Sequence, residues 1–235
     1  MNEYKKRAIL IGAGDMAGMC LMKGGQMIKN VSLSANDGNE TEYEDIVIAL
    51  DGGLIYCEEN SVRPDYIIGD FDSLPEDKLA LLDKYPQKCI QRLPREKDDT
   101  DMLAAIKFAA TKGVTDFVIY GGLGGRLSHT IANIQCLMYL KKRGMMGILV
   151  GGDTKAFLLQ NEKYSFNEKE RGYISVFAYS NSTSGVTLKN LKYELEDADL
   201  TSAFPLGVSN EFVAGKAAQI SVKDGVLLVV MEKQM

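Results

Sequence analysis

Short, almost uniformly apolar segments alternate with segments of helical periodicity over about the first 150 residues of this chain of 235. Strands without a polar face are typical of a parallel sheet that is buried on both sides. Alternation of such strands with helices predicts an α/β layer fold. The expected strands are residues 8–11, 46–50, 66–68, 117–120 and 148–150.

The expected helices have recognisable start and stop signals. Residues 73–76, SLPE, form a capping box with proline in the first turn of one helix. Asp98 or Asp99 is expected to cap a second helix, which stops at Gly113 and has the apolar stripe Met102, Leu103, Ile106 and Ala110. A third helix is expected over residues 128–143, with the stripe Ile131, Ile134, Leu137 and Met138.

The pattern changes after residues 151–153, GGD. Strand-like runs follow with almost no helical periodicity, at residues 173–178, 185–188, 219–222 and 226–231. Asp224-Gly225 lies between the last two and predicts a two-residue hairpin turn. This half is expected to be an antiparallel β-sandwich. We therefore expect two domains, residues 1–153 and residues 154–235.

Composition narrows the class of protein. The net charge of −5 argues against nucleic acid or an anionic membrane as the main partner. No apolar stretch approaches the roughly 20 residues of a membrane-spanning helix. The start of the chain reads as a first strand rather than a signal peptide, and the polar residues 32–45 read as a mobile loop. The four cysteines, none in a C-x-x-C motif, favour reduced core thiols in a cytoplasmic protein: Cys20, Cys57, Cys89 and Cys136.

The sharpest chemical signal is the segment 68–73, IGDFDS. Asp70 and Asp72 are two residues apart at the end of an apolar strand, so their side chains point to the same side. Ligands of open α/β sheets bind at the carboxyl ends of the strands. Two carboxylates there suit Mg²⁺, which takes one or two carboxylates and completes its shell with water and phosphate. Solvated turn residues are the alternative interpretation.

A second acidic segment, residues 95–101, has the sequence REKDDTD. Asp98 as a helix cap and Asp101 bonding back to it would explain two of the acids without a metal. That interpretation leaves Lys97 unexplained. The lysine could reach a phosphate as a point charge, beside the amide donors of the helix start.

Glycine-rich segments follow other expected strands. Residues 121–129, GGLGGRLSH, would let the backbone approach a phosphate, and Arg126 would offer a planar fork to its oxygens. The segment lacks the Gly-Lys-Ser/Thr ending of a P-loop, and His129 reads as a cap or packing residue. Residues 51–53, DGG, and 12–14, GAG, follow two more strands, although the latter misses the dinucleotide-binding spacing. Acids and glycines thus gather at strand ends, which predicts a site for a metal–nucleotide complex.

The order of these motifs resembles the thiamine pyrophosphokinase family. The resemblance covers D-G-G at 51–53, G-D-F-D-S at 69–73, K-D-x-T-D at 97–101 and G-G-L-G-G-R-L-x-H-T at 121–130. It continues in G-V-T-L-K-N-L at 185–191 and G-V-S-N-E-F at 207–212. The resemblance implies an N-terminal ATP-binding α/β domain and a C-terminal β-sandwich that helps to bind thiamine. It also implies a homodimer with the active site between the subunits.

The resemblance also implies roles for individual residues. Mg²⁺ would be held by Asp70, Asp72 and Asp101. The phosphates of ATP would be surrounded by Lys97, Asp98, Thr100 and Arg126. The loops of the nucleotide site would include Asp51, Gly52, Gly124, Gly125 and Ser128. Ser209 and Asn210 would line the thiamine pocket across the dimer interface. Ser128 departs from the family, which usually has aspartate there, and this puts the acceptor substrate in question.

The implied reaction is attack of the thiamine hydroxyl on the β-phosphorus of ATP, with AMP as the leaving group. Lys97 and Arg126 would stabilise phosphate charge, and Asp98 would accept the hydroxyl proton. Two alternatives stay open at this stage. One is the same chemistry on another hydroxymethyl heterocycle, such as a pterin. The other is a nucleotide-binding module that has lost activity.

Overall fold

The structure, a computed structural model, describes residues 5–14, 16, 22–23, 26–27, 43–72 and 74–233. These residues fall into two compact units, the first ending at Gly152 and the second beginning at Asp153. Cys20, Ser73 of the expected capping box, and residues 32–42 of the expected mobile loop lie outside the described residues. The rest of that expected loop, residues 43–45, opens a strand.

The first unit is built on a parallel sheet. Its strand order is β8-β7-β1-β4-β5-β6, and every recorded ladder within it is parallel. The strands are β1 (Lys5–Ile11), β4 (Tyr43–Leu50), β5 (Tyr66–Gly69), β6 (Ile90–Arg92), β7 (Asp116–Tyr120) and β8 (Met146–Gly151). A separate ribbon pairs β2 (Met22–Lys23) with β3 (Gln26–Met27). The five expected strands are confirmed, whereas the short edge strand β6 was missed because its half-exposed residues carry no apolar pattern.

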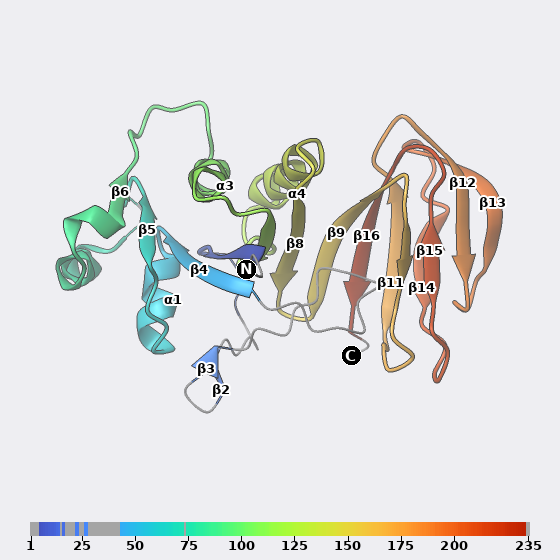
Figure 1. The fold of residues 1–235 in the computed structure, drawn as a ribbon, viewed down its shortest axis with the longest axis horizontal. Coiled ribbons are helices and arrows are strands. Elements are labelled where there is room, and N and C mark those ends of the chain that lie inside the picture. Colours follow the sequence, from blue (N-terminus) through green and yellow to red (C-terminus); the bar gives the residue numbers. More distant parts are fainter. Residues whose placement is uncertain are drawn as a thin grey trace. The chain divides into compact units, whose positions relative to one another are not determined.

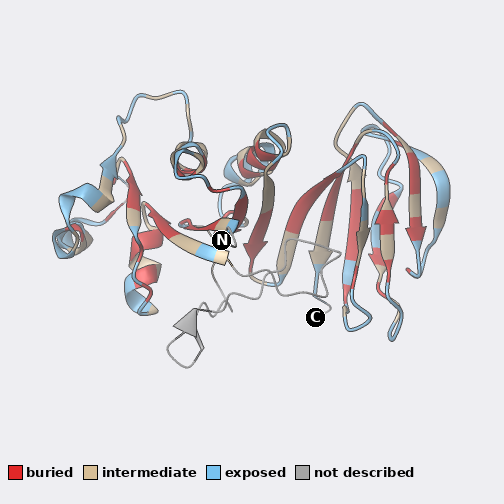
Figure 2. Ribbon diagram, in the orientation of Figure 1, coloured by how far each residue is buried: buried red, intermediate tan, exposed pale blue. Residues whose placement is uncertain are grey.

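Helices cover both faces of this sheet. Figure 1 shows α3 and α4 together on one face and α1 on the other. The buried residues run along the central strands, while the segment before β6 is largely exposed (Figure 2). The helical segments are α1 (Gly53–Glu59), α2 (Glu76–Leu79), the 3₁₀ turns η1 (Ala80–Lys84) and η2 (Gln87–Cys89), α3 (Asp101–Thr111) and α4 (Leu127–Lys141).

The strand order reverses at β1, and this positions the site. From β1 the chain builds outward through β4, β5 and β6, and then returns to add β7 and β8 on the other side. Since the strands are parallel, the loops after β1, β4, β5 and β7 all leave from one edge of the sheet. Such an edge, at a change of strand order, is where open α/β sheets bind ligands.

The predicted cap of α3 is wrong, whereas the predicted start of α4 is within one residue of the observed one. Thr100, not Asp98 or Asp99, caps α3, because its Oγ1 accepts a hydrogen bond from the Leu103 amide at 3.2 Å. Arg126 stands at the N-cap position of α4, so Ser128 lies inside the first turn. Asp98, Asp99 and Thr100 are adjacent at the start of α3, and composition alone does not choose between them.

The predicted apolar stripe of α4 is partly wrong. Ile131 is 51% exposed, and the buried residues of the helix are Asn133, Cys136, Leu137 and Leu140. Asn133 lies on the buried face because its Nδ2 donates to the Gly122 carbonyl at 2.8 Å. A polar residue therefore helps to fix the rotation of this helix, which a search for apolar periodicity does not detect.

The second unit contains two antiparallel sheets, which confirms the predicted sandwich class. One has the order β14-β11-β16-β9 and the other β10-β15-β12-β13. Contacting rings connect the two sheets, from Phe157 through Tyr164 and Phe166 to Phe212. The strands are β9 (Thr154–Gln160), β10 (Lys163–Ser165), β11 (Tyr173–Ala178), β12 (Ser182–Lys189), β13 (Leu195–Thr201), β14 (Gly207–Glu211), β15 (Gln219–Ser221) and β16 (Val226–Glu232).

The predicted hairpin at Asp224-Gly225 is wrong. The strands on either side, β15 and β16, pair in different sheets. The turn carries the chain from one sheet to the other, with Gly225 at φ +109° and its amide donating to Asn161 Oδ1 at 2.8 Å. A turn signal shows that the chain reverses, but it does not show which strands pair.

Among the described residues, Cys57, Cys89 and Cys136 are free thiols. Burial raises the pKa of Cys57 to about 12 and that of Cys136 to about 11. Both therefore behave as inert core residues rather than as nucleophiles. None of the helices in the described part of the chain is both long and apolar enough to cross a membrane.

Candidate active site

Backbone contacts bind the loops after β1 and β7 to each other. The Gly12 amide donates to the Tyr120 carbonyl at 2.9 Å, and the Gly14 amide donates to the Gly121 carbonyl at 3.0 Å. Gly121 has φ +64°, and a Cβ placed on it would lie 2.6 Å from the Gly12 carbonyl oxygen. Glycine is required there by this close approach. Part of the glycine-rich signal therefore reflects loop packing, whereas Gly124 and Gly125 further along are exposed.

Asp51 links the loops after β4 and β5. Its Oδ1 accepts a hydrogen bond from the Phe71 amide at 3.1 Å. A Cβ on Gly69 would lie only 1.9 Å from the same oxygen, so the glycine makes room for the carboxylate. Asp51 itself has φ +44°, an uncommon conformation for a residue with a side chain. The acid is thus held in place by its neighbours and points toward the start of the Asp70–Asp72 loop.

Lys97 joins the two acidic segments that the sequence analysis singled out. Its Nζ donates to Asp70 Oδ2 at 3.3 Å and forms an ion pair with Asp101 Oδ1 at 2.8 Å. The lysine side chain is only 14% exposed. Burial acts to lower the pKa of Lys97, but contact with Asp101 and Asp70 outweighs it and raises the pKa. One ammonium thus holds together carboxylates that lie 31 positions apart in the numbering.

Asp72 lies beside this cluster. Its amide donates to Asp70 Oδ1 at 3.2 Å, and its side chain is exposed. Burial acts to raise the pKa of Asp70, but the contacts with Asp72 and Lys97 prevail and lower it. The structure therefore brings Asp70 and Asp101 together around one nitrogen, with Asp72 on the adjoining turn.

The acids at this edge are crowded. The pKa of Asp51 is raised to about 7, mainly by burial and further by the nearby charges of Asp101 and Asp70. The hydrogen bond from the Phe71 amide acts in the opposite direction and lowers this pKa. The Oδ1 of Asp101 is buried and lies 2.8 Å from the Lys97 ammonium, and a side-chain hydrogen bond with Asp101 also contributes to the raised pKa of Asp51. Carboxylates this close need a proton or a further cation between them.

The carboxylates of this cluster are oxygen donors of the kind that Mg²⁺ takes, but they form no preformed cage. Within the described parts of the chain, no three His, Cys, Asp or Glu side chains are arranged to hold an ion. The ammonium of Lys97 occupies the space between Asp70 and Asp101 instead. The crowding of Asp51, Asp70 and Asp101 is what a hard, oxygen-seeking cation would relieve.

Most of the remaining predicted residues of the first unit are exposed. Asp98, Arg126 and Ser128 are exposed. Thr100 uses its hydroxyl to cap α3. Asp99, which was not predicted as a site residue, holds Lys107 through both of its oxygens at 2.7 Å. Gly52 lies at the N-cap position of α1, directly after Asp51.

In the second unit, Ser209 and Asn210 lie on the edge strand β14. Ser209 is exposed, with φ +59°, and its amide donates to Ser175 Oγ at 3.1 Å. Asn210 is only 4% exposed, and its side chain is bonded to the Tyr193 amide at 2.9 Å and the Tyr193 carbonyl at 2.6 Å. Asn210 therefore fixes the backbone at Tyr193, and Ser209 is the freer of the two to contact a ligand.

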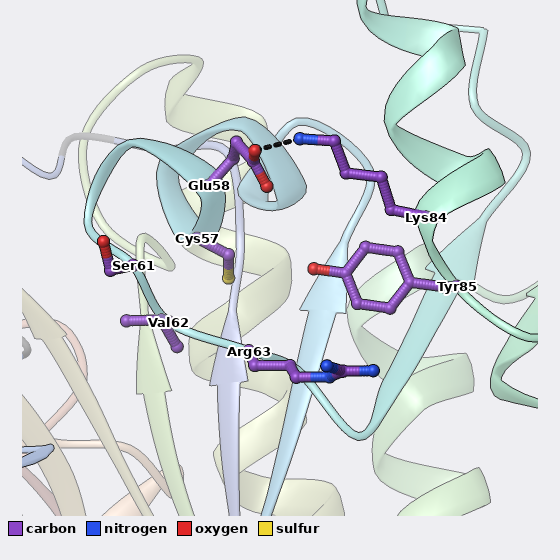
Figure 3. A pocket seen from close by; sticks show the side chains of 7 residues that line it. All are labelled: Cys57, Glu58, Ser61, Val62, Arg63, Lys84 and Tyr85. Atoms are coloured by element: carbon purple, nitrogen blue, oxygen red, sulfur yellow. Dashed lines mark hydrogen bonds and ion pairs between the residues drawn. The ribbon is translucent and has the colours of Figure 1, made fainter.

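A pocket of about 310 Å³ lies elsewhere in the first unit, before the start of β5 (Figure 3). It contains none of the predicted site residues. Its lining residues are Cys57, Glu58, Ser61, Val62, Arg63, Lys84 and Tyr85. The candidate active site is thus an open edge of the sheet and not this cavity.

Two family models match the chain. The model described as thiamin pyrophosphokinase, catalytic domain, matches residues 39–149, which include the acidic cluster. The model described as thiamin pyrophosphokinase, vitamin B1 binding domain, matches residues 161–227, which include Ser209 and Asn210. The chain belongs to the thiamin pyrophosphokinase family. The resemblance found in the motifs is confirmed.

Individual members of this family are distant in sequence and near in fold. Thiamine pyrophosphokinase of Bacillus subtilis (strain 168) is 27% identical over 191 residues, which cover 81% of this chain and 88% of that protein. A crystal structure of the Bacillus subtilis enzyme has a TM-score of 0.79 at 23% identity and covers 98% of this chain and 100% of its own. Yeast thiamin pyrophosphokinase has a TM-score of 0.71 at 18% identity, covering 98% and 87%. These likenesses confirm the fold.

Arg92 is a residue of the catalytic-domain match that the sequence analysis missed. It ends β6 at the same sheet edge. Its guanidinium lies 5.1 Å from the centre of the ring of Phe71, the residue between Asp70 and Asp72. The signal was hidden because β6 itself was not predicted. A cation stacked on this ring adds positive charge beside the acidic loop.

Proposed function

We propose that this chain transfers the pyrophosphoryl group of ATP to the hydroxyl of thiamine, giving thiamine diphosphate and AMP. Matches to both family domains support this activity. The observation that carries it is the convergence of Asp70 and Asp101, from separate segments, on one partly buried ammonium, with Asp51 close enough to share their charge. Neither the pterin alternative nor the inactive module gains support from the comparisons.

Asp70, Asp72 and Asp101 are the residues proposed to hold Mg²⁺. The crowding of Asp51, Asp70 and Asp101 at one edge of the sheet supports this assignment. The ion, when bound, neutralises charge on the phosphate oxygens of the nucleotide. Asp51 lies behind this set, where it fixes the position of the Asp70–Asp72 loop through the Phe71 amide.

The other residues of the edge position the phosphates and bear their charge. Lys97 and Arg126 stabilise the charge that develops as AMP leaves, since placement and charge neutralisation dominate phosphoryl-type transfer. The exposed glycines Gly124 and Gly125 leave the backbone open to phosphate oxygens. Asp98, exposed before α3, accepts the proton of the thiamine hydroxyl.

Thiamine binding is assigned to the second unit of a partner chain in a cytoplasmic homodimer. Ser209 would contact thiamine directly, and Asn210 would hold the backbone around it. Exposed apolar side chains at and just before β14 support an interface there: Phe204, Leu206 and Val208. Edge strands with exposed apolar residues are common sites of association between chains.

The test is formation of AMP and thiamine diphosphate by the purified protein with ATP, Mg²⁺ and thiamine. A hydroxymethylpterin in place of thiamine measures acceptor choice, to which Ser128 is relevant. We expect turnover with thiamine and none with the pterin. Binding of ATP without release of AMP under any of these conditions would refute the proposed activity.

A further inference from the structure

Two of the three acids proposed to hold the metal, Asp70 and Asp101, are already paired with a side chain of the protein. The Nζ of Lys97 lies within 3.3 Å of both Asp70 Oδ2 and Asp101 Oδ1. This space is partly shielded, since the lysine is 14% exposed, Asp70 is 13% exposed and Asp101 is 31% exposed. An ammonium and a divalent cation cannot share it, because two positive charges at such a distance repel strongly in partly buried surroundings.

The position of Lys97 in the chain also lets its side chain move away from the two acids. Lys97 lies before the first residue of α3, four positions ahead of Asp101. Its long side chain is flexible, and its ammonium is a point charge that pairs as readily with phosphate as with carboxylate. A small swing of this side chain vacates the space between the acids and keeps the positive charge at the same edge.

We propose that Lys97 is an exchangeable counter-ion: it neutralises Asp70 and Asp101 while no divalent cation is bound, and it moves to the phosphates of ATP when the cation enters. The inference rests on the proposed function, because it takes Asp70 and Asp101 as the metal-binding acids. It adds a coupling between binding of the divalent cation and binding of ATP. The bare ion must displace Lys97 without compensation, whereas an ion arriving with a triphosphate gives the ammonium a new partner.

The coupling has a clear consequence for metal affinity. Without nucleotide, the wild-type protein binds a divalent ion weakly, because the ion competes with a tethered ammonium. Removing the ammonium removes the competitor. The acids then lack a counter-ion, so the metal-free protein is less stable and gains more stability from an added ion.

The experiment measures Mn²⁺ binding without nucleotide, by calorimetry or by the electron paramagnetic resonance signal of the free ion. Lys97→Met is expected to bind Mn²⁺ more tightly by about tenfold or more, the scale set by neighbouring charges in partly buried sites. Lys97→Arg, which keeps the charge, stays near wild type. Lys107→Met is the matched control, since it removes a lysine whose partner is the surface acid Asp99, and it leaves the affinity unchanged.

Thermal unfolding gives a second readout. In EDTA, Lys97→Met unfolds at a lower temperature than wild type, and Mn²⁺ raises its midpoint by more than it raises that of wild type. Lys97→Gln serves as a second neutral variant where the methionine does not fold.

Two results overturn the inference, and they differ in what they leave standing. If neutral variants at position 97 bind Mn²⁺ no more tightly than wild type while Asp70→Asn abolishes binding, the exchange is wrong and the metal assignment survives. If Asp70→Asn and Asp101→Asn both leave Mn²⁺ binding unchanged, the metal assignment and the exchange fail together. The proposed activity is judged separately, by release of AMP.

Discussion

Two lysine–aspartate arrangements flank the start of α3, and they differ in what surrounds them. Lys97 is 14% exposed and lies between acids from two separate segments. Lys107 is 44% exposed and pairs with Asp99 at the surface. Water screens the charges of the surface pair, so breaking this ion pair would cost the protein little stability. The inner lysine holds acids that would otherwise be crowded and unpaired, so its contacts indicate a site as well as a contribution to stability.

The largest expected effect comes from an acid beside the inner arrangement. Asp72→Asn is expected to lower turnover by about a thousandfold, because it removes one of the three acids proposed to hold Mg²⁺, whose charge stabilises the transferring phosphates. Asp99→Asn, in the surface arrangement, is the matched control and should retain turnover. The measurement is release of AMP with thiamine and ATP, with circular dichroism to check the fold. Wild-type turnover in Asp72→Asn would remove this residue from the metal set.

Lys97→Met is expected to lower kcat/KM for ATP by about a hundredfold, because a charge-assisted contact with phosphate is lost. Lys97→Arg should recover part of this loss, since it restores the charge with a different shape. Steady-state kinetics with varied ATP measure both variants. Unchanged kcat/KM in Lys97→Met would mean that Lys97, like Lys107, makes no contact with ATP that matters for turnover.

Asp51→Asn is expected to change how stability depends on pH. The pKa of Asp51 is raised from 3.8 to about 7 in the folded protein. The folded state therefore holds a proton that the unfolded state releases, and stability falls as pH rises from about 4 to about 7. Asn at this position removes that contribution and flattens the slope. Urea unfolding in EDTA at about pH 5 and about pH 8 measures how the free energy of unfolding changes with pH. An equal change in wild type and in Asp51→Asn would contradict a pKa of Asp51 raised by burial.

Lys107→Met is expected to have the smallest effect. The ion pair with Asp99 is exposed, so its loss leaves activity unchanged and shifts the unfolding midpoint little. Activity assays and thermal unfolding at low and high salt measure this. A loss of turnover comparable to that of Lys97→Met would mean that the two arrangements do not differ in function.

Much of the fold could be predicted because burial leaves a direct mark on composition. The strands around β1 are apolar on both faces, and only a parallel sheet covered by helices buries both. Edge strand β6 and helix α1 were missed, since neither has a long apolar pattern. The structural roles of Thr100 and Asn133 were missed for another reason. Each role depends on one hydrogen bond: Thr100 accepts from the Leu103 amide, and Asn133 donates to the Gly122 carbonyl.

The candidate site was predictable in its residue types and less so in its contacts. Asp70 and Asp101 stood out because acids at strand ends and helix starts suggest cation or phosphate chemistry. Asp51 was noted only as part of a motif, yet it joins two loops and shares the crowding of the acids. Gly69 carried the missing signal, because a glycine at the last position of β5 marks a close approach of another group.

By itself, the sequence determined the fold class, the family and the set of acids, because periodicity and motif order are local properties of the chain. Only the tertiary structure decided which groups meet. It placed β15 and β16 in different sheets despite the Asp224-Gly225 turn, and it set Lys97 between Asp70 and Asp101. The physical reason is that pairing between distant segments depends on packing and charge in three dimensions, which no short stretch of residues encodes.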